Sequence, residues 1–265
     1  TLHNTLFPYT TLFRSWQPPL PPKYTDMTDD QLVAAIRARK AELGSKLVIL
    51  GHHYQQDSVL QFADFTGDSF KLSQLAAEQV EKTGASTVIF EGVHFMAESA
   101  DILTPEDVSV ILPDLSAGCS MADMATYEQT VEAWSELEEL FGEQGAAAAG
   151  DGRSGQVAEW PSGQERSRLD SATGPLGHPA TRIVPICYMN SSAAIKAFVG
   201  ARGGAVCTSS NCEKVFRWAL AGGETPLREG ERVKILFLPD QHLGRNTAAA
   251  MGYDVERDML TWDPN

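Results

Sequence analysis

The residues best suited to chemistry come directly after short apolar segments of the chain. They carry imidazole, phenol, thiol, carboxyl and amide groups: His52, His53, Tyr54, His94, Glu98, Cys119, Tyr188 and Asn190. Imidazole and phenol groups can move protons, and a cysteine thiolate can bind a metal ion. Each position is one where a strand would end, and parallel α/β folds bind their ligands in the loops at strand ends.

Two serines lie near the start of predicted helices and are candidates for binding an anion. Ser69 opens the segment SFKLSQLAAEQVEK, and Ser209 comes just before a helical pattern at about 211–220. The first turn of a helix has unpaired N–H groups and the positive end of the helix dipole, which attract phosphate or carboxylate. Serine is also a common N-cap, so a purely structural role is open at either position.

The other candidates also have ordinary structural explanations. The segment GHHY could be a tight turn whose histidine bonds to the backbone, with Tyr54 packing as an aromatic residue. Cys119 could be a small buried hydrophobic residue, although SAGCSMA is a flexible turn better suited to a ligand. Cys207 lies at a strand end and Cys212 inside a helical pattern, so we do not expect that pair to bind a metal.

The elements that position these residues alternate between helices and strands. A capping box at 28–31 starts a helix that Gly44 should end. Strands are predicted at 46–50, 86–90 and 108–112, with helices at about 57–65, 69–82 and 94–103. This alternation predicts an α/β fold in which helices cover a parallel sheet.

The second half of the chain repeats the first. A helix at about 127–141 precedes strands at 182–187 and 233–238 and helices at about 191–199 and 211–220. GHHYQ in the first half corresponds to CYMNSS in the second, and Ser69 corresponds to Ser209. We therefore expect a three-layer αβα domain with a parallel sheet in each half. The site residues of both halves should meet in one crevice: His52, Tyr54, Ser69, Tyr188, Asn190 and Ser209.

Composition excludes several classes of protein. The net charge of −14, without a run of Lys or Arg, argues against a nucleic-acid surface. No apolar segment approaches the roughly 20 residues that cross a bilayer, and the N-terminus lacks a basic start followed by an apolar stretch. We therefore expect a cytoplasmic protein with no membrane partner. Four cysteines are too few for a disulfide framework in 265 residues, which leaves a metal or cluster role open.

Two segments fall outside the predicted packed regions. TLFPYTTLFRS at 5–15 matches the translation of a common sequencing adapter, and residues 1–27 are expected to be non-native or disordered. Residues 142–181 are rich in Gly, Ala, Ser and Pro and are expected to form a disordered insertion. The predicted domains are then 28–126 and 127–265.

Long motifs in both halves resemble the quinolinate synthase family. They are GHHYQQDSVLQFADFTGDSFKLSQLAAE, GVHFMAESADIL, LPDLSAGCSMADM, YMNSSAAIKAF, CTSSNCEKVFRWAL and LPDQHLGRNTA. The resemblance covers about residues 30–140 and 182–263. It implies an enzyme of NAD biosynthesis built from three similar αβα domains around a pseudo-threefold axis, of which two are present here.

The resemblance also implies a reaction and a cofactor. The family condenses iminoaspartate with dihydroxyacetone phosphate, releasing phosphate and two waters to give quinolinate. A 4Fe-4S cluster, held by one cysteine from each domain, leaves its fourth iron open as a Lewis acid. The use of iminoaspartate implies a functional link to L-aspartate oxidase.

Individual roles follow from the motifs that carry the resemblance. Cys119 matches the first cluster ligand, and Tyr54 matches an acid–base residue. The matched substrate contacts are His52, Ser69, Tyr188, Asn190 and Ser209. The family's other two cluster cysteines, and a catalytic His and Glu, have no counterpart before Asn265, and 142–181 is longer than the usual connection. We therefore expect that this chain lacks the third domain and is inactive by itself.

Two other functions remain open. A divalent-metal hydrolase could use imidazole and carboxylate ligands from His52, His53, Asp57, His94, Glu98 and Asp101. That function predicts bound zinc without sulfide, whereas the cluster predicts iron and sulfide. The chain could also be a non-catalytic module that binds anions.

Overall fold

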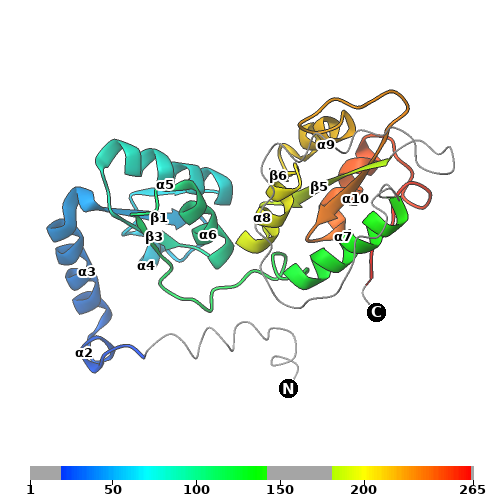
Figure 1. Cartoon of the computed structure of the whole chain (residues 1–265). Coiled ribbons are helices and arrows are strands. Elements are labelled where there is room, and N and C mark those ends of the chain that lie inside the picture. The colour runs from blue at the N-terminus through cyan, green and yellow to red at the C-terminus, as the bar shows by residue number, and fades with distance from the viewer. Residues whose placement is uncertain (1–18, 142–180, 264–265) are drawn as a thin grey trace, which may run out of the picture. The chain divides into compact units, whose positions relative to one another are not determined.

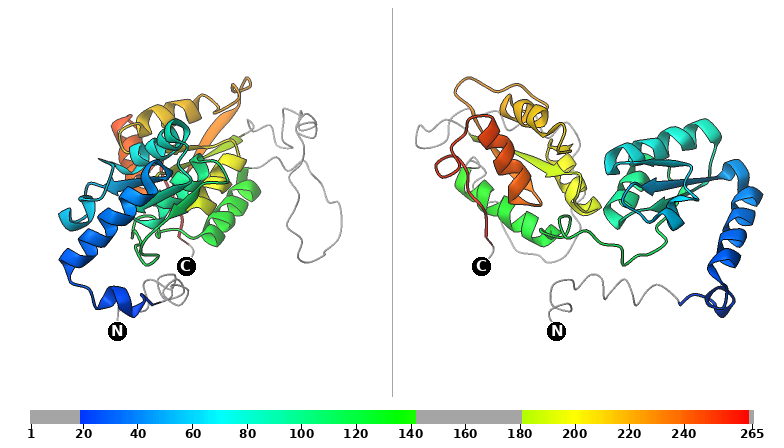
Figure 2. Two further views of the ribbon diagram at one scale, coloured as in Figure 1. Left: turned by 90° about the vertical axis from the view of Figure 1, so that its left-hand side faces the viewer. Right: turned by 180° about the vertical axis from the view of Figure 1, so that it is seen from behind.

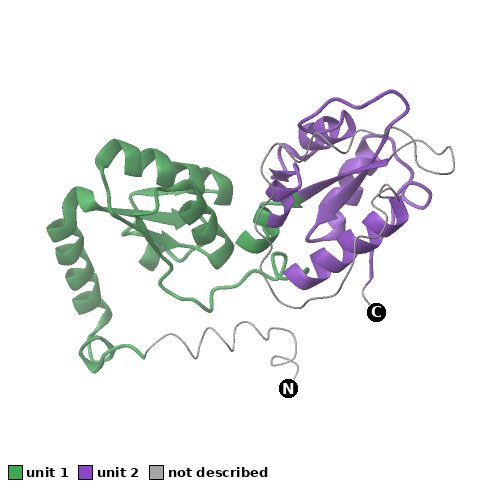
Figure 3. Cartoon of the chain, in the orientation of Figure 1, with its two compact units in different colours: residues 1–125, 187–197 green, residues 126–186, 198–265 purple. Residues whose placement is uncertain are grey.

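The computed structural model describes residues 19–141 and 181–263 (Figure 1). The chain divides into two compact units, which Figure 3 colours separately. Unit 1 comprises Thr1–Ala125 and Cys187–Ala197, and unit 2 comprises Thr126–Ile186 and Phe198–Asn265. Residues 187–197, expected in the second domain, therefore belong to unit 1. The adapter-like segment 5–15 and residues 142–180 of the predicted insertion lie outside the described residues.

Unit 1 begins with two helices. The short helix α2 spans Pro22–Thr25, a region expected to lack structure, and α3 spans Asp29–Leu43. The predicted capping box is confirmed, because Thr28 accepts from the Gln31 N–H and the Gln31 side chain accepts from the Thr28 N–H. Gly44 ends the helix with φ of 53°, a left-handed value that favours glycine, and the 3-10 turn η1 at Gly44–Lys46 leads into the sheet.

The sheet of unit 1 has four parallel strands. They are β1 (Leu47–His52), β2 (Phe65–Gly67), β3 (Thr87–Glu91) and β4 (Ser109–Ile111), in the order β2-β1-β3-β4. Every pairing between neighbours is parallel, with Leu50 opposite Phe65 and Phe90. The α/β class with a parallel sheet is confirmed here. All of the carboxyl ends therefore lie along one edge, where β1 delivers His52.

Helices lie on both faces of this sheet, and alternation along β1 decides which residues meet them (Figures 1 and 2). On one face Leu47 and Ile49 pack with Val33 and Leu43 of α3. Val48 and Leu50 point to the other face, which is covered by α5 (Ser69–Thr83) and its neighbour α6 (His94–Leu103). His52 shares the second face because it continues the same alternation.

The helix predicted at about 57–65 is shorter in the structure. Helix α4 spans only Asp57–Leu60, and Phe65–Gly67 instead form β2 against β1. Asp64 fixes this change of direction, because its carboxylate accepts from the Ile49 N–H and forms an ion pair with Lys40. The apolar spacing of residues 57–65 suits a helix, and this long-range contact overrides it.

Unit 2 has a three-stranded sheet in the order β6-β5-β7. From Thr126 onward the described elements are α7 (Tyr127–Phe141), β5 (Thr181–Tyr188), α8 (Ala193–Ala201), β6 (Ala205–Cys207), α9 (Cys212–Leu220), β7 (Arg232–Leu238) and α10 (Gln241–Ala250). The end of β5 and the first half of α8 fall in residues 187–197, which belong to unit 1. Helices α9 and α10 pack together against β7 (Figure 2). Their apolar side chains meet those of Val184, Ile186 and Phe237 in one core. Sequence analysis placed Cys207 at a strand end without giving bounds for that strand, and it missed α10.

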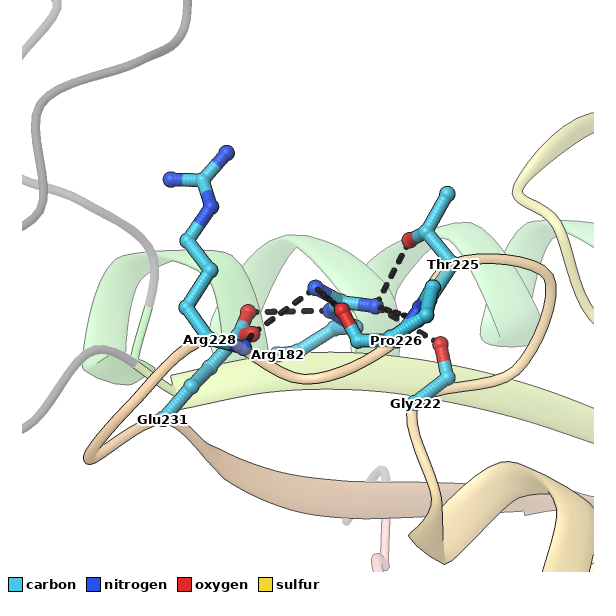
Figure 4. A network of polar contacts seen from close by, with 6 residues as sticks. All are labelled: Arg182, Gly222, Thr225, Pro226, Arg228 and Glu231. Atoms are coloured by element: carbon cyan, nitrogen blue, oxygen red, sulfur yellow. Dashed lines mark hydrogen bonds and ion pairs between the residues drawn. The ribbon is translucent and has the colours of Figure 1, made fainter.

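Arg182, at the start of β5, ties this strand to the loop before β7 (Figure 4). Its guanidinium donates to both carboxylate oxygens of Glu231, at 2.9 and 2.8 Å, and to the carbonyls of Gly222 and Thr225. Burial would raise the pKa of Glu231, but the Arg228 N–H and Arg182 lower it, so the carboxylate stays charged. Bidentate pairing of this kind holds the start of β5 against the loop before β7.

Among the described residues, no helix is both long and apolar enough to cross a membrane.

Candidate functional site

His52 is the central residue of the candidate site in unit 1. It is the last residue of β1 and is only 6% exposed. Its Nε2 lies 3.4 Å from Ser69 Oγ at the start of α5, and its ring centroid lies 3.9 Å from that of Tyr54. The end of β1 and the start of α5 thus bring three predicted site residues together.

The surroundings of His52 keep its ring neutral. Burial and, to a smaller extent, the neighbouring His53 lower its pKa to about 4, although Asp68 acts in the opposite direction. The Tyr54 backbone N–H donates to Nδ1 at 3.4 Å. A neutral ring that accepts at Nδ1 carries its proton on Nε2. The Nε2–H group therefore faces Ser69 as a hydrogen-bond donor at neutral pH.

Ser69 is the first residue of α5 and not its N-cap. Asp68 occupies the cap position and accepts from the Lys71 N–H at 2.9 Å. The structural explanation considered for Ser69 is therefore wrong. Its hydroxyl lies beside His52 at the positive end of a 15-residue helix. Together these residues offer neutral donors where an anionic oxygen would be stabilised.

Tyr54 is half-exposed beside this pair. Burial raises the pKa of its hydroxyl, and the charge of Cys119 raises it further. The phenol therefore keeps its proton at neutral pH and can act as a proton donor. Cys119 acts on this pKa although 65 positions separate it from Tyr54 in the chain.

Cys119 lies in the loop that follows β4. It is the one partly exposed cysteine of the chain, since Cys187, Cys207 and Cys212 are buried. The side-chain amide of Asn190 donates to its Sγ at 3.8 Å. An amide donor of this kind stabilises a thiolate or a sulfur bound to metal.

Tyr188 ends β5 and Asn190 lies in the turn that follows, and both belong to unit 1. Ser191 Oγ donates to the Tyr188 carbonyl at 2.8 Å, and Lys196 Nζ donates to the Ser191 carbonyl at 2.6 Å. Burial lowers the pKa of Lys196 to about 8. Sequence analysis missed this lysine, because YMNSSAAIKAF gives no sign that its charged side chain folds back onto the preceding turn.

Glu98 anchors the same turn from α6. Its carboxylate accepts from the Ala193 N–H at 2.8 Å, at the first residue of α8. A carboxylate is favourable beside the unpaired N–H groups of a helix start. Glu98 thus serves the site by positioning residues 188–193, and nothing in its own motif indicated this long-range bond.

Ser209 lies in unit 2, apart in the chain from the residues above. It is exposed in the turn between β6 and α9, and Asn211 holds the N-cap position of α9. The Asn211 side chain accepts from the Thr208 N–H at 2.7 Å, within the turn. Ser209 is therefore not an N-cap either.

Glu91 is the last residue of β3 and lies on the face of the sheet opposite to His52. Burial raises the pKa of its carboxyl to about 7, although Lys40 acts to lower it. Its partner in the sheet is Gly51, where an added Cβ would lie 2.5 Å from a Leu60 methyl group. The glycine that precedes His52 is therefore needed for α4 to pack closely on the sheet.

The ligands proposed for a divalent-metal hydrolase do not form a common site. Within residues 19–141 and 181–263, no three His, Cys, Asp or Glu residues are placed to hold a metal ion. His53 Nδ1 lies 3.0 Å from the Gly67 carbonyl, and His94 Nδ1 lies 3.3 Å from the Ala117 carbonyl. The prediction that Cys119 binds a cluster stays a prediction, and the described residues supply no complete ligand set for one.

Comparison with known proteins identifies relatives of this chain. The family described as Quinolinate synthetase A protein matches residues 34–265. A quinolinate synthase of Acidobacterium capsulatum is 48% identical over 241 residues, which cover 91% of this chain and 51% of that protein. Those of Geobacillus thermodenitrificans and Streptomyces coelicolor are 46% and 48% identical over 92% and 90% of this chain, and 53% and 48% of their own lengths. The chain thus spans about half the length of these curated relatives.

Proposed function

This chain belongs to the quinolinate synthetase A family, and we propose that it forms the part of a quinolinate synthase that binds substrate anions and contributes one cluster thiolate. The observation that carries the proposal is the placement of His52, Ser69 and Tyr54 together at the end of β1. These residues belong to the motifs that resemble the family.

The proposed substrates are iminoaspartate and dihydroxyacetone phosphate. Both are anionic, and the chain as a whole has a net charge of −14, so local donors must hold them. His52 Nε2–H, the Ser69 hydroxyl and the N–H groups of the first turn of α5 would bind one carboxylate or phosphate group. Tyr188, Asn190 and Ser209 would provide further contacts to the substrates.

Tyr54 is the proposed acid–base residue. The condensation loses phosphate and two waters, so hydroxyl groups must be protonated as they leave. The raised pKa of Tyr54 keeps a proton available at its hydroxyl, and its half-exposed position lets the hydroxyl reach a substrate.

Cys119 is the proposed ligand from this chain to a 4Fe-4S cluster. The family is generally one of iron–sulfur enzymes, and the partly exposed thiol with its amide donor fits that role. A cluster bound there would supply Lewis acidity to polarise a substrate oxygen. The remaining thiolates would come from the part of the family's length that this chain does not span. An oxidase that makes iminoaspartate from aspartate and a cytoplasmic setting belong to the same proposal.

The test measures quinolinate formation by a chain extended to the full family length. We expect Tyr54→Phe to lower kcat by about 100-fold or more, because a positioned proton donor contributes on that order, and to change KM little. The matched control is Tyr24→Phe, in α2 outside the region that matches the family. An unchanged kcat in folded Tyr54→Phe protein would reject the acid–base role, and no quinolinate from the unsubstituted extended chain would reject the function.

A further inference from the structure

Two cysteines that belong to no part of the proposed site are in contact in unit 2. Cys207 is the last residue of β6 and Cys212 is the first residue of α9. Their sulfur atoms lie 3.7 Å apart, and the side chains are 0% and 1% exposed. Neither sulfur needs a change of fold to reach the other, because the turn 208–211 already brings the two ends together.

Cys212 has the surroundings of a reactive thiol. A hydrogen bond from Cys207 and another from the Thr247 side chain stabilise its thiolate, and its pKa falls to about 7 although burial and the charge of Asp240 oppose the change. Cys212 also stands at the start of a nine-residue helix, a place that lowers thiol pKa values. Cys187 provides the contrast, since burial raises its pKa to about 11.

We propose that Cys207 and Cys212 form a reversible intramolecular disulfide when a peroxide oxidises the protein, with Cys212 as the thiol that reacts first. The proposal rests on the contact between the two sulfurs and on the position of Cys212 at the start of α9. It does not depend on the proposed catalytic function.

The chemistry balances with hydrogen peroxide as the only other reactant. The Cys212 thiolate attacks one peroxide oxygen, the O–O bond breaks, and a sulfenic acid and hydroxide form. The Cys207 sulfur then attacks the Cys212 sulfur, the S–O bond breaks and water leaves. The two thiols lose two electrons and two protons, and the peroxide is reduced to two waters.

Both sulfurs are buried, so peroxide can reach them only when the structure opens locally, and the turn 208–211 between the two cysteines is the nearest exposed segment of the chain. Ser209 and Ser210 in this turn are exposed, and a few local bonds hold it closed, such as the one from the Thr208 N–H to Asn211 Oδ1. A disulfide would close a covalent loop around the same residues. If Ser209 contacts substrate, as in the proposed function, oxidation would restrict that contact.

The experiment treats the reduced chain with hydrogen peroxide and maps its thiols by mass spectrometry after quenching, denaturation and alkylation. We expect Cys207 and Cys212 to lose alkylation together, with a mass loss of about 2 Da that dithiothreitol reverses. The rate should rise about fivefold from pH 6 to 7 and less than about twofold from 7 to 8, because it follows the thiolate fraction of Cys212.

Variants separate the two roles. In Cys207→Ser the oxidised Cys212 should remain as a sulfenic acid that dimedone traps, whereas in Cys212→Ser the residue Cys207 should stay alkylatable. Cys187→Ser is the control and should form the disulfide at the unsubstituted rate. Circular dichroism confirms that each variant is folded. Full alkylation of Cys207 and Cys212 after Cys119 has been oxidised, or a disulfide that involves Cys119, would overturn the proposal.

Discussion

At the scale of single residues, the chemistry of the site depends on neutral hydrogen-bond donors. A protonated His52 would be a stronger anion ligand, but its burial behind Tyr54 and next to His53 disfavours the charge. The ring instead offers one Nε2–H with a fixed direction, because the backbone of Tyr54 occupies Nδ1. An anion could then bind without a charged ring having to be buried in the free protein.

The first prediction concerns the pH dependence that His52 gives to stability. The folded-state pKa lies below the ordinary value of 6.5, so between about pH 6.5 and 4 the unfolded chain binds a proton that the folded chain does not. Stability should therefore fall as the pH falls. Urea unfolding at pH 7 and at pH 5 gives the free energy of unfolding of each protein. We expect this free energy to fall by about 1–2 kcal/mol less in His52→Gln than in the unsubstituted chain. Equal losses in the two proteins would contradict the neutral, buried ring.

Motifs located the site residues, but their bonding partners could not be predicted from sequence. The segment GHHY and Ser69 are short-range features, and a strand end followed by a helix start brings them together. Asp68 was missed as the cap because both Asp and Ser are favourable there, and the choice depends on backbone angles. Lys196 was missed because its role depends on the path of the chain after β5.

At the scale of elements, the start of α5 separates a stabilising role from a binding role in adjacent residues. Asp68 accepts from the backbone of Lys71, whereas the hydroxyl of Ser69 contacts His52. Asp68 therefore stabilises the helix, whereas the proposed function needs Ser69 to bind the substrate.

The second prediction uses this adjacent pair as matched variants. Asp68→Ala should lower the free energy of unfolding by about 1 kcal/mol, because the cap bond is lost, and Ser69→Ala should change it by less than about 0.5 kcal/mol. In the extended protein, Ser69→Ala should weaken dihydroxyacetone phosphate binding about tenfold, the cost of a hydrogen bond to a charged group. Unfolding and isothermal titration measure the two effects. A larger stability loss in Ser69→Ala than in Asp68→Ala would contradict the assignment.

The longer helices were predicted within a few residues, as was the three-residue strand β4, whereas β2 was missed and β6 was indicated only by its end at Cys207. Helices α3, α5, α6 and α7 begin at or next to the expected positions, and at α3 the capping box marks the start directly. Strands β2 and β6 have three residues each, too few to show an alternation. Their existence depends on pairing with β1 and β5, which is information that the local sequence lacks.

At the scale of the whole molecule, the chain repeats a strand–turn–helix arrangement in two units. Residues at the carboxyl end of β1 and in the turns after β4 and β5 lie in unit 1, and Ser209 follows β6 in unit 2. The expectation that all six site residues share one crevice therefore stays a prediction. The curated relatives extend over about twice the length of this chain.

The most direct test of the proposed function is whether Cys119 holds an iron–sulfur cluster. The measurement is iron and acid-labile sulfide per chain after anaerobic reconstitution and desalting with a chelator. It compares this chain, a chain extended to the full family length, and the extended chain with Cys119→Ser or with the buried control Cys187→Ser. We predict about four iron and four sulfide in the extended protein and in its Cys187→Ser variant. This chain should give near-background values because one thiolate cannot retain a cluster, and so should extended Cys119→Ser because it lacks a ligand. A full cluster in extended Cys119→Ser protein would contradict the account.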